Sequence, residues 1–305
     1  NVATAVTKTT GVSKQEGSNN IYVRGLGDRY NSTSINGLPV TSNDPEKKNI
    51  ALDIFSTDIV EFISIDKVYG PKTSGDFAGG NVDIKSVNYK GNGMFELSLG
   101  SNIGTNAINK YNSFNLQQGP SKFGFSSYGV PNNPLGAYNF GNSLVPGKET
   151  PVGSGLGLKA GKSFNIGEVG KLNLFATANF ENGFEFREGI NQSVNAQGAR
   201  LKSFNQERFS YNTNTTGMFN ANYRINANNT IAYNFLMVNS SSQIKDSYTG
   251  YIRDIAEDNN GLVQRGTYIQ NTLFINQLLG NHKLSDKIDL DWGASYNKVE
   301  GDMPD

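Results

Sequence analysis

The sequence predicts an all-β transmembrane barrel, of which this chain carries about seven strands, preceded by a small α+β domain. Three features of the chain lead to this prediction. Residues 91–305 alternate apolar and polar side chains with a period of two, which is typical of β-strands with one hidden face. Long and short connections between these alternating segments follow one another along the chain. Residues 1–90 instead combine short β-branched runs with Gly-containing turns.

The composition of the 305 residues fits many strands and turns better than a helical enzyme. The chain contains 41 Asn, 35 Gly, 18 Phe and 14 Tyr, residue types that favour turns or strands. Its 27 basic and 27 acidic residues balance, so the charge gives no reason to expect a nucleic-acid partner. The absence of Cys excludes disulfides and thiolate metal sites within the chain, and is compatible with a location in the cell envelope.

The hydropathy pattern predicts no transmembrane helix, because no run of about 18 apolar residues occurs. Barrel strands do not need such a run, since each one exposes only alternate residues to lipid. The chain begins at Asn1, which is neither an initiator Met nor part of a basic leader. We therefore expect an internal piece of a longer precursor.

The first domain is expected to open with a short amphipathic helix over residues 1–8. Its apolar face would consist of Val2, Ala5 and Val6, which recur at helical spacing, and the helix would end at Gly11 before a strand.

Two further local signals punctuate this domain. Asn36-Gly37 lies between two β-branched runs and predicts a tight hairpin, because both residues tolerate positive φ. A helical turn is expected over residues 56–60, where Ser56 or Thr57 would cap it.

Seven segments of the second domain alternate with a period of two. In the last of them, for example, Leu290 and Trp292 fall on one face while Asp289 and Asp291 fall on the other. Residues 268–278 alternate less cleanly than the rest. The predicted strands are residues 94–103, 154–164, 171–181, 217–225, 230–238, 268–278 and 287–297.

The connections favour a membrane barrel over a soluble sandwich, because outer-membrane barrels pair short periplasmic turns with long extracellular loops. Strands of about ten residues also match a tilted bilayer crossing. An open sheet edge in lipid would leave backbone groups unpaired, so we expect more strands after residue 305. The predicted long, exterior connections are 104–153, 184–210 and 239–266, and the short ones are 165–170, 226–229 and 280–286.

Three elements of the first domain follow one another in a specific order. They are Arg24-Gly25, then Asn36-Gly37-Leu38-Pro39-Val40, then Gly70-Pro71 with Gly79-Gly80-Asn81-Val82-Asp83-Ile84. Together they resemble the plug domain of TonB-dependent outer-membrane receptors. The chain departs from many members of that family at residues 72–76, and its extended segment 25–30 is typical of a Bacteroidetes-like subgroup.

The resemblance implies an architecture and a location. Residues 1–90 would be an N-terminally incomplete plug domain, held in the lumen, and residues 91–305 the N-terminal part of a 22-stranded barrel. The protein would lie in the outer membrane of a Gram-negative bacterium.

The resemblance also implies a function: binding a scarce solute outside and importing it when the plug is displaced. Its partners would be outer-membrane lipid, a small solute of unknown class, and the TonB complex, reached through a segment upstream of Asn1. A surface lipoprotein or another outer-membrane protein is a further candidate partner. No cofactor is implied.

Some residues of the first domain are expected to hold the plug in place. The resemblance implies that Arg24 pairs with a carboxylate on the barrel wall, although a solvated Arg remains the alternative. Gly79 and Gly80 mark a close backbone approach, which we interpret as contact with the wall. The remaining members of this set are the turn residues Gly25, Asn36, Gly37, Gly70 and Pro71.

A second group is expected to contact the ligand. It consists of the apical residues Asp28, Arg29, Tyr30 and Asn31, which would lie beneath the aromatic-rich segment 104–153. Aromatic side chains of that segment could stack on a ligand or contact a protein. They could equally pack the segment against itself over the mouth of the barrel. The aromatic residues of the segment are Tyr111, Phe114, Phe123, Phe125, Tyr128, Tyr138 and Phe140.

Other candidate sites are weaker. The segment 25–30 starts like a dinucleotide fingerprint but lacks its third Gly and the following helix. His282 is the only His, so it cannot build a metal site with other His or Cys ligands. The strand carboxylates Asp289 and Asp291 are ordinary for a hydrated lumen. No nucleophile motif occurs, and we expect no enzyme.

Two alternatives to a transporter stay open. The chain could be a receptor-like barrel that serves as a structural subunit, or a client, of an outer-membrane assembly or secretion complex. It could also be a soluble β-sandwich adhesin, which would require solubility without detergent.

Overall fold

The computed structural model describes residues 2–14, 21–42, 48–70, 73, 75, 77–126 and 146–303. No helix among them is long and apolar enough to span a membrane. Pro71 and most of residues 72–76 lie outside this described part.

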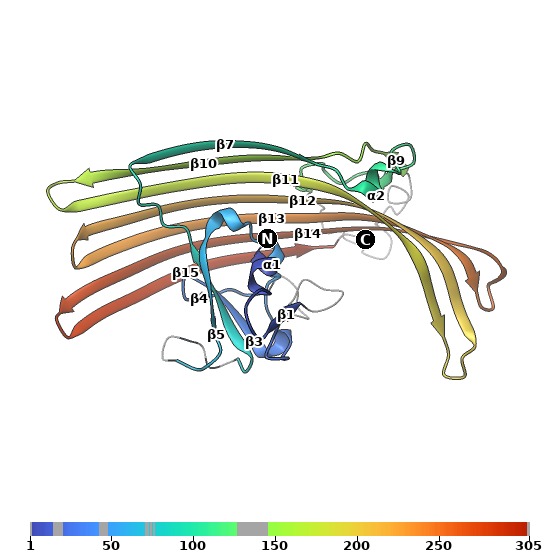
Figure 1. The fold of residues 1–305 in the computed structure, drawn as a ribbon, viewed down its shortest axis with the longest axis horizontal. Helices are drawn as coiled ribbons and strands as arrows, with labels where there is room; N and C mark the ends of the chain where they lie inside the picture. Colours follow the sequence, from blue (N-terminus) through green and yellow to red (C-terminus); the bar gives the residue numbers. More distant parts are fainter. Residues whose placement is uncertain are drawn as a thin grey trace, which may run out of the picture.

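An antiparallel sheet of seven strands forms the larger part of the chain, and we call it the wall (Figure 1). Every strand pairs with its neighbours in sequence order, which confirms the seven predicted strands. In that order the strands are β7 (Gly93–Asn102), β10 (Gly153–Ile166), β11 (Gly170–Val194), β12 (Arg200–Asn226), β13 (Asn229–Ile252), β14 (Ala256–Ser285) and β15 (Ile288–Asp302).

Four wall strands are much longer than the predicted ten residues. β11 to β14 contain 25, 27, 24 and 30 residues. The predicted long connections 184–210 and 239–266 are therefore wrong: most of their residues extend the strands, and the chain turns only at 195–199 and 253–255. In these extensions aromatic residues such as Phe186 and Phe209 continue on the outer face, but polar residues occur on both faces, so the alternation weakens. The backbone ladder continues because it needs no side-chain pattern.

The short connections lie at the other end of the wall. The chain turns at 167–169 and 227–228, within the predicted short connections 165–170 and 226–229. The predicted connection 280–286 is too long, since β14 continues to Ser285 and leaves a two-residue turn. These turns and the two long hairpins lie at opposite ends of the wall in Figure 1.

Four short strands form the main sheet of the N-terminal domain, in the order β4-β3-β6-β5. β3 and β6 pair in parallel, and the other two pairs are antiparallel. The elements are α1 (Val2–Val6), β1 (Val12–Lys14), β2 (Ile21–Val23), η1 (Asp28–Tyr30), β3 (Asn31–Ile35), β4 (Leu38–Pro39), η2 (Leu52–Ile54), η3 (Thr57–Ile59), β5 (Val60–Asp66) and β6 (Gly80–Ser86).

The local predictions for this domain hold in two places and fail in one. Asn36 and Gly37 have φ of 54° and 81°, which confirms the tight hairpin. The Ser56 hydroxyl accepts a hydrogen bond from the Asp58 N–H at 3.3 Å, which confirms the cap. The helix face is partly wrong: Ala3, rather than Ala5, is buried.

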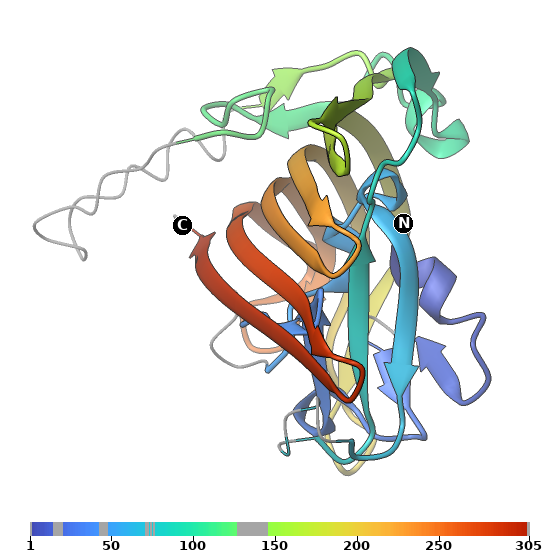
Figure 2. The same cartoon turned by 90° about the vertical axis from the view of Figure 1, so that its left-hand side faces the viewer.

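The wall separates two environments because successive side chains of a strand point to opposite faces. In β12, Asn214 donates to the Ile54 carbonyl of the N-terminal domain at 3.1 Å. The neighbouring Thr213 faces Gly124, which lies on the other side of the sheet. Figure 2 shows the wall curving past the N-terminal domain, which lies on its concave side. We call this side the inner face and the other the outer face.

The segment after β7 lies on the outer face. It contains α2 (Thr105–Ile108) and β8 (Asn115–Gln117), and β8 pairs with β9 (Pro146–Lys148). We call residues 105–126 the outer strap.

Candidate functional site at the inner face of the wall

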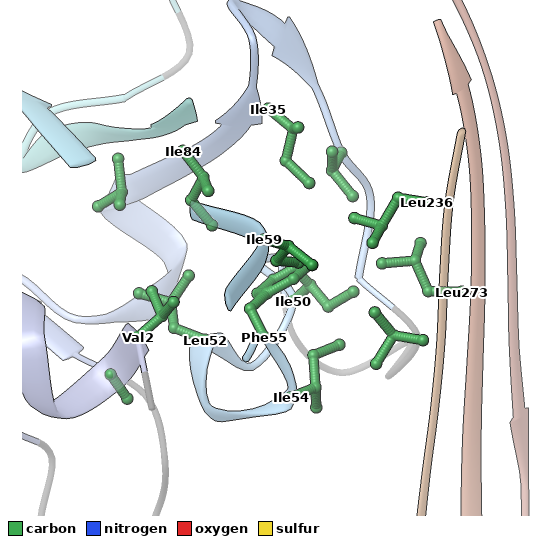
Figure 3. Packing of buried hydrophobic residues seen from close by; sticks show 14 of the residues in the cluster. Val2, Ile35, Ile50, Leu52, Ile54, Phe55, Ile59, Ile84, Leu236 and Leu273 are labelled. Carbon is green, nitrogen blue, oxygen red and sulfur yellow. The ribbon is translucent and has the colours of Figure 1, made fainter. Parts of the chain in front are cut away.

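The N-terminal domain and the wall share one hydrophobic core. Figure 3 shows Leu236 and Leu273 of the wall pointing toward Ile59 and Phe55 of the N-terminal domain. The packing between them leaves a cavity of only about 20 Å³, close to the volume of one water molecule. The wall residues in this inner apolar patch are Phe175, Met218, Leu236, Val238, Leu273 and Ile275.

Around this patch, neutral amides hold the β3–β4 hairpin against the wall. Gln277, which is 1% exposed, accepts from the Asn36 side chain at 2.8 Å and donates to the Ile35 carbonyl at 2.9 Å. Asn297 donates to the Pro39 carbonyl at 3.0 Å. Since Asn36 has positive φ, the turn that sets the hairpin also aims its amide at the wall.

One ion pair joins the two parts among the described residues. The Lys159 ammonium lies 2.7 Å from a carboxylate oxygen of Asp58, which follows the Ser56 cap. Asn179 donates to the other oxygen of Asp58 at 3.2 Å, and Glu96 lies 3.6 Å from the same ammonium. The pair is partly exposed, so solvent screens its attraction.

A polar space of about 230 Å³ lies between the hairpin and the wall. The side-chain oxygens of Asn88 and Asn220 are buried and lack a hydrogen-bond partner among the described residues. Because the space is polar and larger than one water, ordered water can satisfy these oxygens. Its lining includes Asn36, Lys85, Asn88, Asn220, Asn222 and Asn234.

The predicted plug lock residue Arg24 does not lie at this interface. Its side chain is exposed, its φ is 56°, and its N–H donates to the Gly11 carbonyl at 2.8 Å. It makes no ion pair with another described residue, so its pairing with a wall carboxylate stays a prediction. Gly25 follows with φ of 76°, a backbone conformation that favours glycine.

The interpretation of Gly79 and Gly80 as contacts with the wall is wrong. A Cβ at Gly79 would lie 2.3 Å from the Asn31 Oδ1, and a Cβ at Gly80 would lie 2.9 Å from a Val23 methyl. Both neighbours belong to the N-terminal domain. The close approach is real, but it packs β6 against β2 and β3. Gly70 is exposed and forms a turn with Thr73, while Pro71 lies outside the described residues.

Two of the predicted ligand residues are engaged inside the domain. The Asp28 carboxylate accepts from the backbone N–H groups of Lys48 and Asn49 at 2.6 and 3.2 Å. The Asn31 amide is buried and donates to three backbone carbonyls at 3.0 to 3.3 Å. Arg29 and Tyr30 are exposed, so ligand contact by these two stays a prediction.

The aromatic segment does not cover the mouth of the wall where the structure describes it. Phe114 is fully buried on the outer face, with its ring centroid 5.6 Å from that of Phe184 and 5.1 Å from that of Phe209. Tyr128, Tyr138 and Phe140 lie outside the described residues.

His282 belongs to strand β14 rather than to a turn. It stacks on Trp292 and pairs with Asn229 at 2.8 Å. No group of three potential metal ligands occurs among the described residues.

Sequence reasoning missed the residues that make the interface: Asp58, Lys159 and Gln277. The alternation along the strand contained a signal for Lys159. It follows the apolar, outward-facing Leu158, so its own side chain must point to the inner face.

Comparison with known proteins identifies the N-terminal domain. Residues 1–81 match the family model of the TonB-dependent Receptor Plug Domain. No curated protein matches the chain in sequence.

Solved receptors show distant likeness. The siderophore receptor PiuA from Acinetobacter baumannii is 12% identical with a TM-score of 0.40, over 98% of this chain and 43% of that one. A mutant of the ferric enterobactin receptor PfeA from Pseudomonas aeruginosa is 11% identical with a TM-score of 0.32, over 99% and 56%. The chain thus spans about half the length of these receptors.

The plug match begins the chain, and the matched domain lies on the concave face of an antiparallel wall. This family contains transporters rather than enzymes. The Bacteroidetes-like subgroup stays a prediction. The chain thus carries a TonB-dependent receptor plug domain over residues 1–81, followed by an antiparallel wall, and the TonB-dependent receptors that it resembles are proteins of the Gram-negative outer membrane.

Proposed function

We propose that the complete receptor binds a scarce solute outside the cell and imports it when the inner-membrane TonB complex pulls on the plug. The force would act through a segment upstream of Asn1. In this proposal the plug domain comprises residues 1–90 and the barrel begins at residue 91, between β6 and β7. The proposal rests mainly on one observation: among the described residues, the plug–wall interface consists of one apolar patch, a few neutral hydrogen bonds and one partly exposed ion pair.

The energies of the contacts support a movable plug. The ion pair between Asp58 and Lys159 is partly exposed, and such pairs contribute about 0.2–1 kcal/mol. A neutral hydrogen bond, such as those of Gln277, contributes about 1 kcal/mol net. Each buried apolar side chain of the shared core contributes about 1.5–3 kcal/mol. The apolar patch therefore dominates the cost of separation, which is large enough to keep the plug closed until work is supplied.

A removable crosslink between plug and wall tests the proposal. A Cβ at Gly293 of β15 would lie 3.2 Å from a Leu38 methyl of β4, so Leu38→Cys with Gly293→Cys puts one Cys on each side of this contact. The full-length receptor is first screened for binding to iron chelates, glycans, peptides and cobalamin. The oxidised double variant should then bind the selected solute but fail to import it, and reductant should restore import.

Each single Cys variant serves as the control and should import normally. Unchanged import by the fully oxidised variant would contradict plug displacement. A receptor whose cellular role persists without TonB would instead favour a structural subunit of an outer-membrane complex.

A further inference from the structure

The outer strap covers a part of the outer face that contains both polar residues and an aromatic cluster. The Tyr211 hydroxyl donates to the Lys122 carbonyl at 2.6 Å, and Asn239 donates to the Gly124 carbonyl at 2.8 Å. The Ser126 N–H donates to Gln270 at 2.9 Å. These contacts come from three neighbouring strands, so the strap crosses the wall rather than following one strand.

Gly124 shows how closely the strap approaches. Its φ is 77°, and a Cβ would lie 1.9 Å from the Thr213 hydroxyl and 2.6 Å from the Ser241 hydroxyl. Only glycine fits both the backbone conformation and the space. The strap is thus seated on the wall at this point.

At the far end of the strap, Phe114 and Leu116 are buried in an aromatic cluster of the wall, and Lys110 adds charged contacts. Lys110 lies 3.1 Å from Glu207 and 3.5 Å from Glu188, and its ammonium lies 4.5 Å from the centre of the Phe186 ring. The hydrogen bond with Glu207 raises the pKa of the Lys110 ammonium.

The near edge of the strap coincides with a change in the chemistry of the outer face. Where Asn239 and Thr272 pair across β13 and β14, the outer face is polar and covered. Two residues along the strands, toward the short turns, Met237 pairs with Phe274. From there the outer face is apolar and uncovered, and Phe219 is 38% exposed.

Phe123 lies at this boundary. Its side chain is 67% exposed, and its ring centroid is 5.7 Å from that of Phe180, which points outward from β11. Aromatic rings collect at the two rims of the apolar band of a membrane barrel. An exposed Phe beside the rim, on a segment fixed to the wall, has the chemistry of a contact with lipid.

We infer that the outer strap rests on the outer leaflet of the membrane, with Phe123 inserted at the rim of the apolar band. The strap thereby covers the outer face of the wall above the lipid. The partner is the acyl-chain border of the leaflet. This inference depends on the outer-membrane location and on an outward orientation of the long hairpins, and it does not depend on solute import.

Lipid quenching of an added indole tests the contact. The full-length receptor carrying Phe123→Trp is reconstituted in nanodiscs with brominated or ordinary acyl chains, and the parent receptor's fluorescence is subtracted. Most of the added fluorescence should be lost with brominated lipid. Tyr111→Trp is the matched control: it lies on the same strap next to Lys110, is 50% exposed, and should keep nearly all its added fluorescence.

Phe219→Trp, on the uncovered apolar face, reports that the receptor is inserted. Strong quenching at residue 219 with equal, weak quenching at residues 123 and 111 would overturn the inference and leave the proposed import untouched. If the Trp variant fails to insert, a nitroxide at Phe123→Cys in a Cys-free receptor gives the same test. Oxygen should then relax it more than a water-soluble nickel complex, and the reverse result would overturn the inference.

Discussion

The two faces of the wall carry opposite chemistry on the same strands. The inner face is mostly polar and contacts the plug through amides, one described ion pair and a single apolar patch. The outer face is apolar and uncovered near the short turns, and farther along the strands the outer strap covers polar residues and an aromatic cluster. Because successive side chains of a strand point to opposite faces, each strand contacts the plug with one set of residues and the lipid or the outer strap with the other. We therefore expect substitutions at adjacent positions of one strand to have different effects, because one position contacts the plug and the next contacts the lipid or the outer strap.

The largest expected effect is a charge on the outer face. Leu174→Arg should destabilise the barrel by about 2–4 kcal/mol, if the residue lies near the bilayer midplane, because the charge must leave water. Asn222→Arg, on the inner face beside the polar space, should be tolerated far better. Urea unfolding of the full receptor in lipid vesicles measures both. Equal losses would mean that the two faces are not distinct environments.

A smaller effect should separate two glutamines of β14. Gln277→Ala removes the partners of the Asn36 amide and the Ile35 carbonyl, which should cost about 1–3 kcal/mol at the plug. The plug hairpin should exchange its amide hydrogens faster, and small antibiotics should enter without TonB.

Gln270→Ala is the matched control, because Gln270 lies on the same strand but accepts from Ser126 of the strap. It should speed hydrogen exchange in residues 121–126 and leave antibiotic entry unchanged. Increased entry in both variants would indicate that the glutamines act on the strand rather than on its separate faces.

The strand order of the wall could be predicted from sequence because lipid and plug impose alternation. The same rule explains why residues 268–278 alternate weakly: Leu273 and Ile275 face inward in the apolar patch, while Phe274 faces outward. In a sequence, an apolar residue on the polar face only disturbs the alternation of apolar and polar residues. In the structure it marks contact with a second domain.

The strand ends and the interface could not be predicted in the same way. Toward the long hairpins, polar residues fall on both faces, such as Asp246 on the inner face and Lys245 on the outer face, so the alternation weakens and does not distinguish strand from loop. Gly79 and Gly80 indicate a close approach of the backbone, but the sequence does not show whether the neighbour is the wall or another strand of the N-terminal domain. Local signals, such as the Asn36 turn, are complete within a few residues and could therefore be predicted.

The smallest expected effect concerns the ion pair on the inner face. Asp58→Asn removes the charge that faces Lys159 but keeps the hydrogen-bonding shape near Asn179. The Asp58 side chain is 36% exposed, so screening limits the loss to about 0.2–1 kcal/mol. The free energy of unfolding of the plug in the parent receptor should fall as the salt concentration rises. In Asp58→Asn this salt dependence should be smaller. Glu185→Gln, which breaks the exposed pair with Arg187 beyond the plug, should keep the parent's salt dependence. A parental salt dependence in Asp58→Asn would mean that the pair of Asp58 with Lys159 does not help to hold the plug.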